Sequence, residues 1–239
     1  LDRPHQSMLI GIGGTGVVTV DALLVTATLF DGNYAVHLDQ TGLSQKAGAV
    51  LSNLIISDQP ILRGGKISAG EADLVLAFDI LSAASPDNLS RCEASRTSLV
   101  ANTSQVPTAQ VIVDVSNSQP SLEVLKKAML AFVEAETSHW IDAESICHSL
   151  FGDSVTVNVF LLGVAFQLGQ LPITSTSIEK AIEVNGVEIE KNLKAFRWGR
   201  KSITDRLAVD KKVAPESGER LTSSEGQLSL LIKNSGAHA

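Results

Sequence analysis

Cysteine and aromatic residues are scarce in this chain, and each shortage excludes a class of function. The two cysteines, Cys92 and Cys147, stand 55 residues apart and form no Cys-x-x-Cys pair. An iron–sulfur cluster needs about four thiolates, so the chain holds none unaided, and we interpret both cysteines as buried or half-buried thiols in preference to a disulfide. Aromatic residues make up 4% of the chain and the net charge is −7. Nucleic-acid surfaces use stacking rings and basic side chains, so we predict no nucleic-acid partner.

Metal-ligand spacings and catalytic motifs are also lacking. The five histidines show none of the spacings typical of zinc sites, which predicts no metal site in this chain. There is no G-x-S-x-G, no H-E-x-x-H and no phosphate-binding P-loop. The thiamine-diphosphate signature is missing too, because Gly152-Asp153 is followed by Ser154 and not by the required glycine. We therefore predict no catalytic residue here.

A targeting or membrane segment is equally hard to find. Residues 1–7 have no apolar core, and no stretch reaches about 18 uninterrupted apolar residues. We expect a cytoplasmic protein with no membrane partner. The chain begins without methionine, and we expect a piece of a longer polypeptide in preference to a processed start.

What is present is an alternation of strand and helix patterns, which predicts an α/β fold. We expect a three-layer, mostly parallel sheet with helices on both faces, Rossmann-like, followed by C-terminal helices and a tail. Expected strands cover residues 8–10, 34–38, 49–57, 73–78, 98–101, 111–115 and 140–142. Expected helices cover residues 17–30, 121–133, 143–150, 154–171, 177–184 and 187–198, with a further helix start near Pro86. Composition changes beyond Asp205, so we divide the chain into a domain at 1–205 and an arm or linker at 206–239.

The first strand runs into a glycine loop, Gly11-Ile-Gly-Gly-Thr-Gly16, that opens the first helix. Glycine tolerates positive φ, and the unpaired N–H groups of a helix start attract anions. The loop fits G-x-G-x-x-G, and Asp39 lies 23 residues beyond Gly16, near the spacing of a ribose-binding acid. Either the loop approaches a phosphate or a partner's backbone, or its glycines only solve a tight turn. Asp39 likewise either binds a ribose or ends the second strand.

Two alternatives follow from the glycine loop alone. One is a self-contained NAD(P)-binding oxidoreductase. The other is an adenylating enzyme of the ubiquitin-activating type, whose fold opens with a similar loop. Those enzymes resemble one another in an Asp-x-Asp after the second strand, whereas here Asp39 is followed by Gln40-Thr41.

A second polar loop follows the second strand, and one amide stands in an apolar helix. Lys46 is the only cation between residues 41 and 48, so it offsets a phosphate or carboxylate, lies at a subunit interface, or is a solvated loop lysine. Asn158 is costly in apolar surroundings unless it is hydrogen-bonded, so it either ties a buried loop or faces a cofactor pocket shared with another subunit. The candidate binding residues are Gly11, Gly13, Gly14, Thr15, Gly16, Thr41, Gly42, Ser44, Gln45, Lys46 and Asn158.

The two loops together resemble the gamma subunit or domain of the 2-oxoacid:ferredoxin oxidoreductases, most of all the indolepyruvate member. The Gly42-x-Ser-Gln-Lys-x-Gly48 loop carries more of this resemblance than the first glycine loop does. Further matches run in family order along the chain: Glu71-Ala-Asp73-Leu-Val-Leu76, Asn102, Asn158 with Leu162-Gly163, and Asn192-x-x-Ala195-Phe196-x-x-Gly199-Arg200.

The resemblance implies a complex that decarboxylates an aryl 2-oxoacid oxidatively with thiamine diphosphate and Mg²⁺. Electrons would pass through iron–sulfur clusters to ferredoxin, and the acyl group would pass to coenzyme A. These cofactors are expected on other domains or subunits, with none held by this chain alone. The chain would be a structural and gating component whose glycine-loop edge contributes to the assembled active site, and it would be inactive in isolation.

Overall fold

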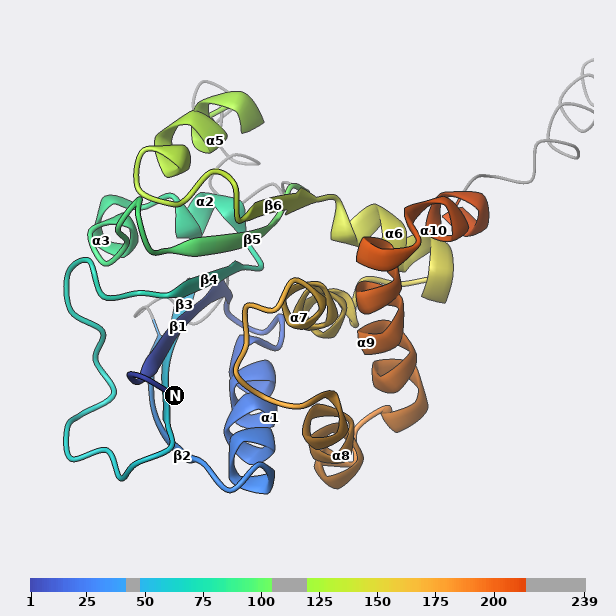
Figure 1. Ribbon diagram of the computed structural model, residues 1–239. Coiled ribbons are helices and arrows are strands. Elements are labelled where there is room, and N and C mark those ends of the chain that lie inside the picture. The colour runs from blue at the N-terminus through green and yellow to red at the C-terminus, as the bar shows by residue number, and fades with distance from the viewer. Residues whose placement is uncertain (42–47, 105–119, 214–239) are drawn as a thin grey trace, which may run out of the picture.

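The computed structural model describes residues 1–41, 48–104 and 120–213. In these ranges six strands form one sheet in the order β2-β3-β1-β4-β5-β6 (Figure 1). The strands are β1 (His5–Ile12), β2 (Tyr34–Thr41), β3 (Ala49–Ser57), β4 (Leu74–Ala77), β5 (Ser98–Asn102) and β6 (Ser138–Ile141). The predicted strand at 111–115 lies outside the described residues.

The sheet is mixed because of a single strand. β1, β4, β5 and β6 are parallel neighbours, whereas β3 pairs antiparallel with both β1 and β2. The α/β fold and the mostly parallel sheet are confirmed. The β2–β3 hairpin, folded back between β1 and the sheet edge, is a feature that the strand patterns did not predict.

Helices cover both faces of the sheet, as expected. They are α1 (Val17–Phe30), α2 (Ile80–Ala83), α3 (Pro86–Leu89), α5 (Leu122–Leu130), α6 (Ala143–Phe151), α7 (Val157–Gln167), α8 (Ser175–Asn185), α9 (Ile189–Thr204) and α10 (Arg206–Val213). Figure 1 shows α2, α3 and α5 on one side of the strands and α1 and α7 on the other. None of the helices described is long and apolar enough to cross a membrane.

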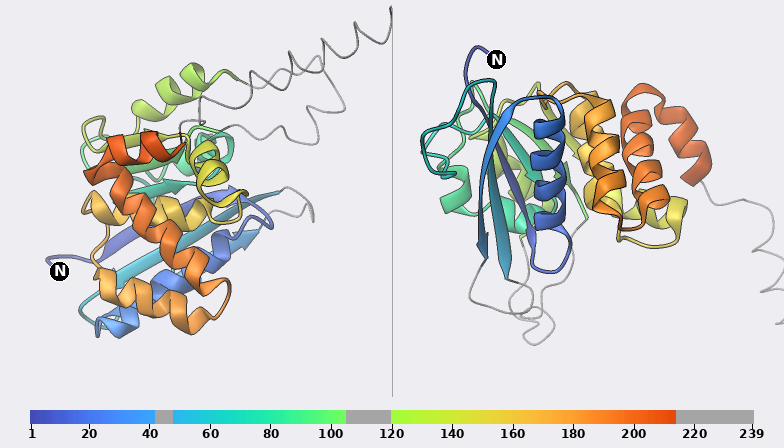
Figure 2. Two further views of the ribbon diagram at one scale, coloured as in Figure 1. Left: turned by 90° about the vertical axis from the view of Figure 1, so that its right-hand side faces the viewer. Right: turned by 90° about the horizontal axis from the view of Figure 1, so that it is seen from below.

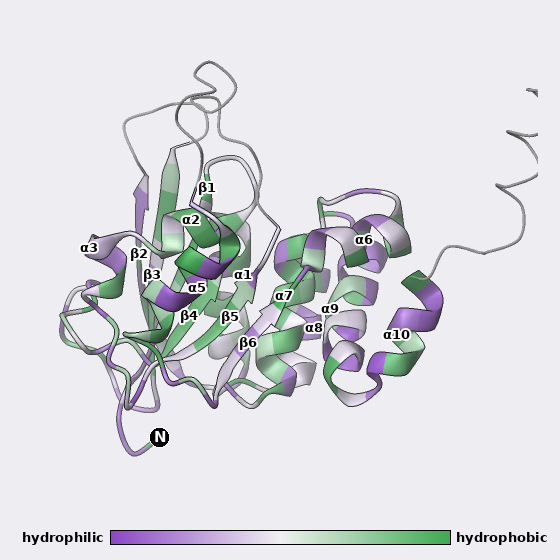
Figure 3. Ribbon diagram, turned by 90° about the horizontal axis from the view of Figure 1, so that it is seen from above, coloured by the Kyte–Doolittle hydropathy of each residue, from purple (hydrophilic) through white to green (hydrophobic). Residues whose placement is uncertain are grey.

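Two hydrophobic cores lie on opposite faces because side chains alternate along each strand. Leu9 of β1 joins the core beneath α1 and α7, while its neighbours Met8 and Ile10 join the core beneath α2 and α5. The inner strands β4 and β5 therefore have mainly apolar sequences, and Figure 3 shows both coloured hydrophobic between their covering helices. This double covering is what an apolar run of strand length predicts for a parallel strand.

A further helical layer stacks outside the first on the α7 face. The views in Figure 2 show α9 and then α10 lying progressively farther from the sheet. α10 buries Val209 completely among residues of this core. The packed part of the described chain thus extends past the expected boundary at 205. Residues 214–239 lie outside the described ranges, so the predicted division into a domain and an arm stays a prediction.

Candidate functional site

The glycine loop sits at the carboxyl end of β1, where parallel α/β sheets form their ligand sites. Gly14 and Gly16 take positive φ values of 85° and 92°, a region that residues with a Cβ rarely adopt. Gly16 is the N-cap of α1, and no side chain caps this helix start. The first-turn N–H groups of α1 are therefore free of a side-chain acceptor, which is the arrangement that favours an anion or a partner's carbonyl.

The two predicted loops are in direct contact where both are described. The backbone N–H of Gly13 donates to the carbonyl of Gly48 at 2.8 Å, so the end of the second loop is fastened to the first. Thr41 lies at the end of β2, paired with Val50 of β3. Gly42, Ser44, Gln45 and Lys46 lie outside the described residues, and their predicted role stays a prediction.

Individual members of the glycine loop differ in what they can offer a ligand. Gly11 is buried inside β1 and paired with Val50, so it is part of the strand that precedes the turn and is not open to a ligand. Gly13, Gly14 and Thr15 are exposed on the loop itself. The hydroxyl of Thr15 donates to the Ile12 carbonyl at 2.7 Å, which closes the turn. Only the exposed crest of the loop is therefore available to a ligand or a partner.

Asn158 of α7 makes a second tie to the glycine loop, in addition to that of Gly48. It stands in the first turn of α7 with 6% of its surface exposed, and its Nδ2 donates to the carbonyl of Thr15 at 2.9 Å. This contact joins residues 143 positions apart in the chain. The bond supports the interpretation of Asn158 as a loop tie, although the tied loop is exposed and not buried, and the role of Asn158 toward a cofactor stays a prediction.

Two clefts meet at Asn158 and Thr15, which line both. One, of about 100 Å³, lies over the ends of β1, β4 and β5, with Phe78, Asp79 and Asn102 in its wall. The other, of about 390 Å³, runs past the start of α1 to the α8–α9 connection, where Glu188 and Asn192 line it. Asn192 belongs to the downstream motif read from the sequence, and the fold brings it to the glycine loop.

The described walls of the two clefts carry negative charge, which limits the anionic ligands that they can bind without a partner. Among their described residues, the ionisable side chains are Asp79, Glu144 and Glu188, and neither lysine nor arginine is present. A helix start contributes only about 0.3–1 kcal/mol toward one anion. A phosphate-rich or carboxylate-bearing ligand therefore needs cations that the described walls do not supply.

Asp39 does not occupy the position of a ribose-binding acid. In a dinucleotide fold the second strand lies beside the first, whereas here β3 separates β2 from β1. Adjacent strands are about 4.8 Å apart, so β2 lies roughly 10 Å from β1 across the sheet. Asp39 also stands within β2 and does not end it, and its Oδ1 accepts a hydrogen bond from Ser52 Oγ at 2.5 Å. Both sequence interpretations of Asp39 are corrected by this geometry.

Asn102 and Asp142 organise the far end of the smaller cleft, and the role of Asp142 was not predicted. Asn102 Oδ1 accepts from the N–H of Ala143 at 3.1 Å, joining the end of β5 to the start of α6. Asp142 caps α6 by accepting from Ser145 N–H at 3.0 Å. Burial acts to raise the pKa of Asp142, but hydrogen bonds from Ser104 and Ser145 outweigh it and the pKa is lowered. Asp142 thus stays ionised as a structural cap.

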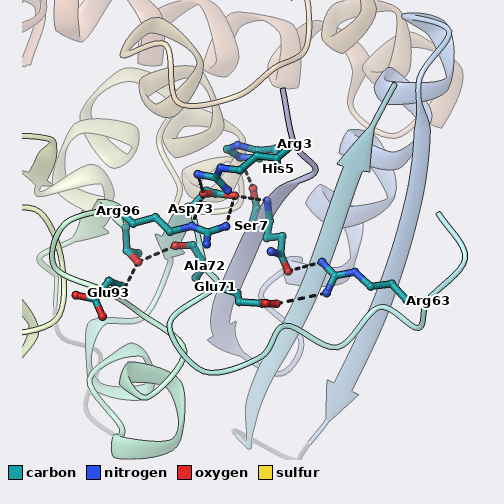
Figure 4. A network of polar contacts seen from close by, with 11 residues as sticks. Arg3, His5, Ser7, Arg63, Glu71, Ala72, Asp73, Glu93 and Arg96 are labelled. Atoms are coloured by element: carbon teal, nitrogen blue, oxygen red, sulfur yellow. Dashed lines mark hydrogen bonds and ion pairs between the residues drawn. The ribbon is translucent and has the colours of Figure 1, made fainter. Parts of the chain in front are cut away.

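A second polar cluster lies at the opposite end of the strands from the glycine loop, where β1, β4 and β5 begin (Figure 4). Its centre is Asp73, from the Glu71-Ala-Asp73 motif, which is 8% exposed and contacts Arg3 at 2.6 Å and Arg96 at 2.8 Å. The backbone N–H of Gln6 donates to the same carboxylate at 2.8 Å. The motif therefore marks an ion-pair network with a buried carboxylate at its centre, which fixes the start of β4 and is remote from the glycine loop.

The cysteines behave as the sequence predicts. Cys92 and Cys147 are free and buried, and they belong to the two separate cores on opposite faces of the sheet. Burial raises the pKa of each thiol to about 12. The interpretation of both as buried thiols is confirmed, and their separation across the sheet does not suit a shared cluster.

Comparison with known proteins identifies the class of this α/β fold. The structure of the keto/oxoacid ferredoxin oxidoreductase gamma subunit from Geobacter sulfurreducens matches with a TM-score of 0.58 and 20% identity. The match covers 84% of this chain and 98% of that one, and it shows a shared fold.

The family follows from the sequence comparison. The model of the Pyruvate ferredoxin/flavodoxin oxidoreductase family matches residues 6–202, and this chain belongs to that family. The indolepyruvate oxidoreductase subunit IorB of Pyrococcus horikoshii is 28% identical over 212 residues, covering 86% of this chain and 98% of its own. The protein of the same name from Thermococcus kodakarensis is 26% identical, over 87% of this chain and 100% of its own.

Proposed function

We propose that this chain is the gamma component of an indolepyruvate-type 2-oxoacid:ferredoxin oxidoreductase. In the assembled complex it would support thiamine-diphosphate-dependent oxidative decarboxylation of an aryl 2-oxoacid to an acyl-coenzyme A. The family membership and the two relatives named as indolepyruvate oxidoreductase subunits support this function. The alternatives, an NAD(P)-binding oxidoreductase and an adenylating enzyme, find no such support.

The glycine-loop site of this chain lacks positive charge in its described part, and this observation supports the proposal most strongly. The loop is held rigidly by Gly48 and Asn158, yet the described walls around it carry carboxylates and no cation. A rigid edge of this kind suits a surface that partner subunits complete, with the positive charge for an anionic ligand coming from them and from Lys46.

The chain's own residues do not fit the redox cofactors of such a complex. Cys92 and Cys147 lie in different cores with raised pKa values, which rules out a cluster held between them. We therefore assign thiamine diphosphate, Mg²⁺ and the iron–sulfur clusters to partner subunits, and coenzyme A to the assembled complex. Ferredoxin would be the electron acceptor, and we propose a cytoplasmic location for the complex.

Reconstitution tests the proposal directly. The chain is co-expressed with the remaining subunits, and indolepyruvate-dependent reduction of ferredoxin or a viologen dye is measured with and without it. We expect turnover only in the assembled complex and none from the isolated chain. Turnover by the isolated chain, or full activity of a complex that lacks it, would refute the gamma assignment. NADH titration and ATP–pyrophosphate exchange on the isolated chain test the two alternatives, and we expect both to be negative.

A point variant tests whether the glycine-loop edge matters in the complex. Asn158→Asp keeps the side-chain size but replaces the donor to Thr15 with a carboxylate that repels the carbonyl. Losing a buried hydrogen bond costs about 1–3 kcal/mol, so we expect roughly a tenfold fall in the activity of the complex. Asn185→Asp, at the exposed end of α8, is the matched control and should leave activity unchanged. Equal activities of the two variant complexes would show that the loop tie has no catalytic consequence.

A further inference from the structure

Three potential metal ligands gather between α1 and the edge strand β2. Asp21 comes from α1, and His37 and Asp39 come from β2. His37 and Asp39 are two positions apart, so their side chains leave the same face of the strand. One ligand atom from each of the three residues lies within 4.8 Å of the others.

Asp21 is the unusual member of this group. Its side chain is 0% exposed, whereas that of His37 is 47% exposed, so the carboxylate reaches the cluster from beneath. Asp21 Oδ2 contacts His37 Nδ1 at 2.6 Å. The second oxygen, Oδ1, is buried and has no hydrogen-bond donor among the described residues. A buried acceptor without a partner destabilises the folded state, and this calls for a compensating group.

Other ways of satisfying Asp21 are less complete. No Lys or Arg ion pair to Asp21 occurs in the described part of the chain, where its side-chain contact is with His37. Asp39 brings a second carboxylate toward the first, and one imidazole does not balance two acids. A divalent cation balances both carboxylates and uses the imidazole nitrogen as a neutral ligand.

We propose that Asp21, His37 and Asp39 bind a divalent transition-metal ion, and that zinc suits the site best. Zinc takes nitrogen from histidine and oxygen from aspartate at about 2.0–2.2 Å, in tetrahedral geometry. Ligand atoms around such an ion are about 3.4 Å apart, so the present cluster, at up to 4.8 Å, needs movements on the order of 1 Å. His37 and Asp39 are accessible and can make these movements, while the buried Asp21 provides the fixed ligand. Three protein ligands leave a fourth position for water.

The sequence offered no sign of this site because the ligands come from two elements. Zinc motifs are recognised by short spacings within one loop or helix, whereas Asp21 and His37 are 16 residues apart and meet only when β2 packs against α1. A bound ion would fasten the edge strand to the helix that begins at the glycine loop. The inference does not depend on the proposed function, since the three ligands lie between α1 and β2 and line neither of the two glycine-loop clefts.

Zinc binding to the full chain tests the site. The purified 239-residue chain is titrated with Zn²⁺ by calorimetry and by competition with a chromophoric chelator. Co²⁺ substitution adds a visible spectrum that reports tetrahedral coordination. We expect one ion per chain with micromolar or tighter affinity, weakened about tenfold or more by H37Q and by D39N. His148, exposed on α6, gives the matched control H148Q, which should bind as the wild type does.

Stability supplies a readout that does not rely on spectroscopy. At a Zn²⁺ concentration about 100 times Kd, the melting temperature should rise by roughly 5–10 °C in the wild type and in H148Q. H37Q and D39N alter accessible side chains and should fold without zinc, so a smaller rise in them reports lost binding. The inference is overturned if saturable binding is absent, or if H37Q and D39N bind zinc as tightly as the wild type. D21N, at the buried position, should abolish binding, and circular dichroism checks that this variant folds.

Discussion

His5 is an uncharged ring held inside a network of charges at the start of β1. Burial disfavours its protonated form and lowers its pKa to about 4. Asp73 acts the other way, while the guanidinium groups of Arg3 and Arg96 add to the lowering. Its Nε2 lies 3.0 Å from Ser7 Oγ, which gives the neutral ring a hydrogen-bond partner. The network thus keeps a histidine neutral at a pH where an exposed one is charged.

Because of the lowered pKa of His5, the free energy of unfolding should decrease as the solution becomes acidic. In the unfolded chain a histidine takes up its proton near pH 6.5, whereas the folded state resists until about pH 4. The stabilising contribution is complete above pH 6.5 and is lost as the pH drops toward 4. Between pH 7 and 5 we expect the wild type to lose on the order of 1 kcal/mol relative to H5Q, which binds no proton.

Urea midpoints of both proteins at the two pH values measure this effect. The comparison must be made between variants because Asp21 has the opposite sign. Burial raises the pKa of Asp21 to about 6, so the folded state gains relative stability there as the pH falls. A gap between wild type and H5Q that stays constant from pH 7 to 5 would contradict the prediction.

The crossing of α7 and α9 is the tightest contact between two elements in the described chain. A Cβ added to Gly163 would lie 2.1 Å from the carbonyl oxygen of Phe196, and one on Gly199 would lie 2.0 Å from that of Phe160. Both obstacles are backbone atoms, which cannot rotate away. Alanine normally stabilises a helix by about 1 kcal/mol over glycine, but here the steric conflict is the larger effect.

Alanine at either position should separate the two helices. We expect G163A and G199A each to lose about 3 kcal/mol or more, measured by urea denaturation, or to remain insoluble. Gly64 provides the control, because it is exposed with no atom within 4 Å of an added Cβ and no positive φ. G64A should be neutral or more stable by up to about 1 kcal/mol. Wild-type stability of G163A would mean that the two helices can move apart at little cost.

Elements were predictable from sequence to the extent that their signals are local. The apolar run of α1 and the β-rich run of β3 gave the bounds that the structure has, Val17–Phe30 and Ala49–Ser57. The four residues of α2 were missed, because one short turn carries no periodicity. The direction of β3 was missed for a different reason. Strand patterning records which side chains are buried and not which neighbour a strand pairs with.

In the candidate site too, residues with a local sequence signal could be predicted, and contacts between distant segments could not. Asn158 could be singled out because an amide in an apolar helix needs a partner, and that partner proved to be the Thr15 carbonyl. The cluster of Asp21 with His37, and the network around Asp73, could not be predicted, because each forms only when separate elements meet. Asp39 was misread because the fingerprint spacing assumes that the second strand adjoins the first.

At the scale of the whole molecule, α10 extends the folded unit past the predicted boundary at residue 205. Val209 is 0% exposed and belongs to the core on the α1 and α7 face of the sheet, whereas Leu207 on the same helix is 73% exposed. Burying a valine side chain stabilises by about 1.5–3 kcal/mol. A domain cut at residue 205 would lose this contribution and would leave part of the core beside α6 and α9 uncovered.

Two truncated chains measure this directly, one ending at Asp205 and the other at Val213. We expect the shorter chain to be less stable by about 1.5–3 kcal/mol in urea denaturation, because it differs from the longer one only by α10. Val209→Ala in the longer chain should give part of this loss, about 1–2 kcal/mol, since two methyl groups leave the core. Leu207→Ala is the matched control, and its effect should stay within about 0.5 kcal/mol because the side chain is exposed. Equal stability of the two truncated chains would restore the boundary at 205 and make α10 the first part of the arm. A loss confined to the shorter chain and to Val209→Ala would instead show that α10 is part of the folded domain.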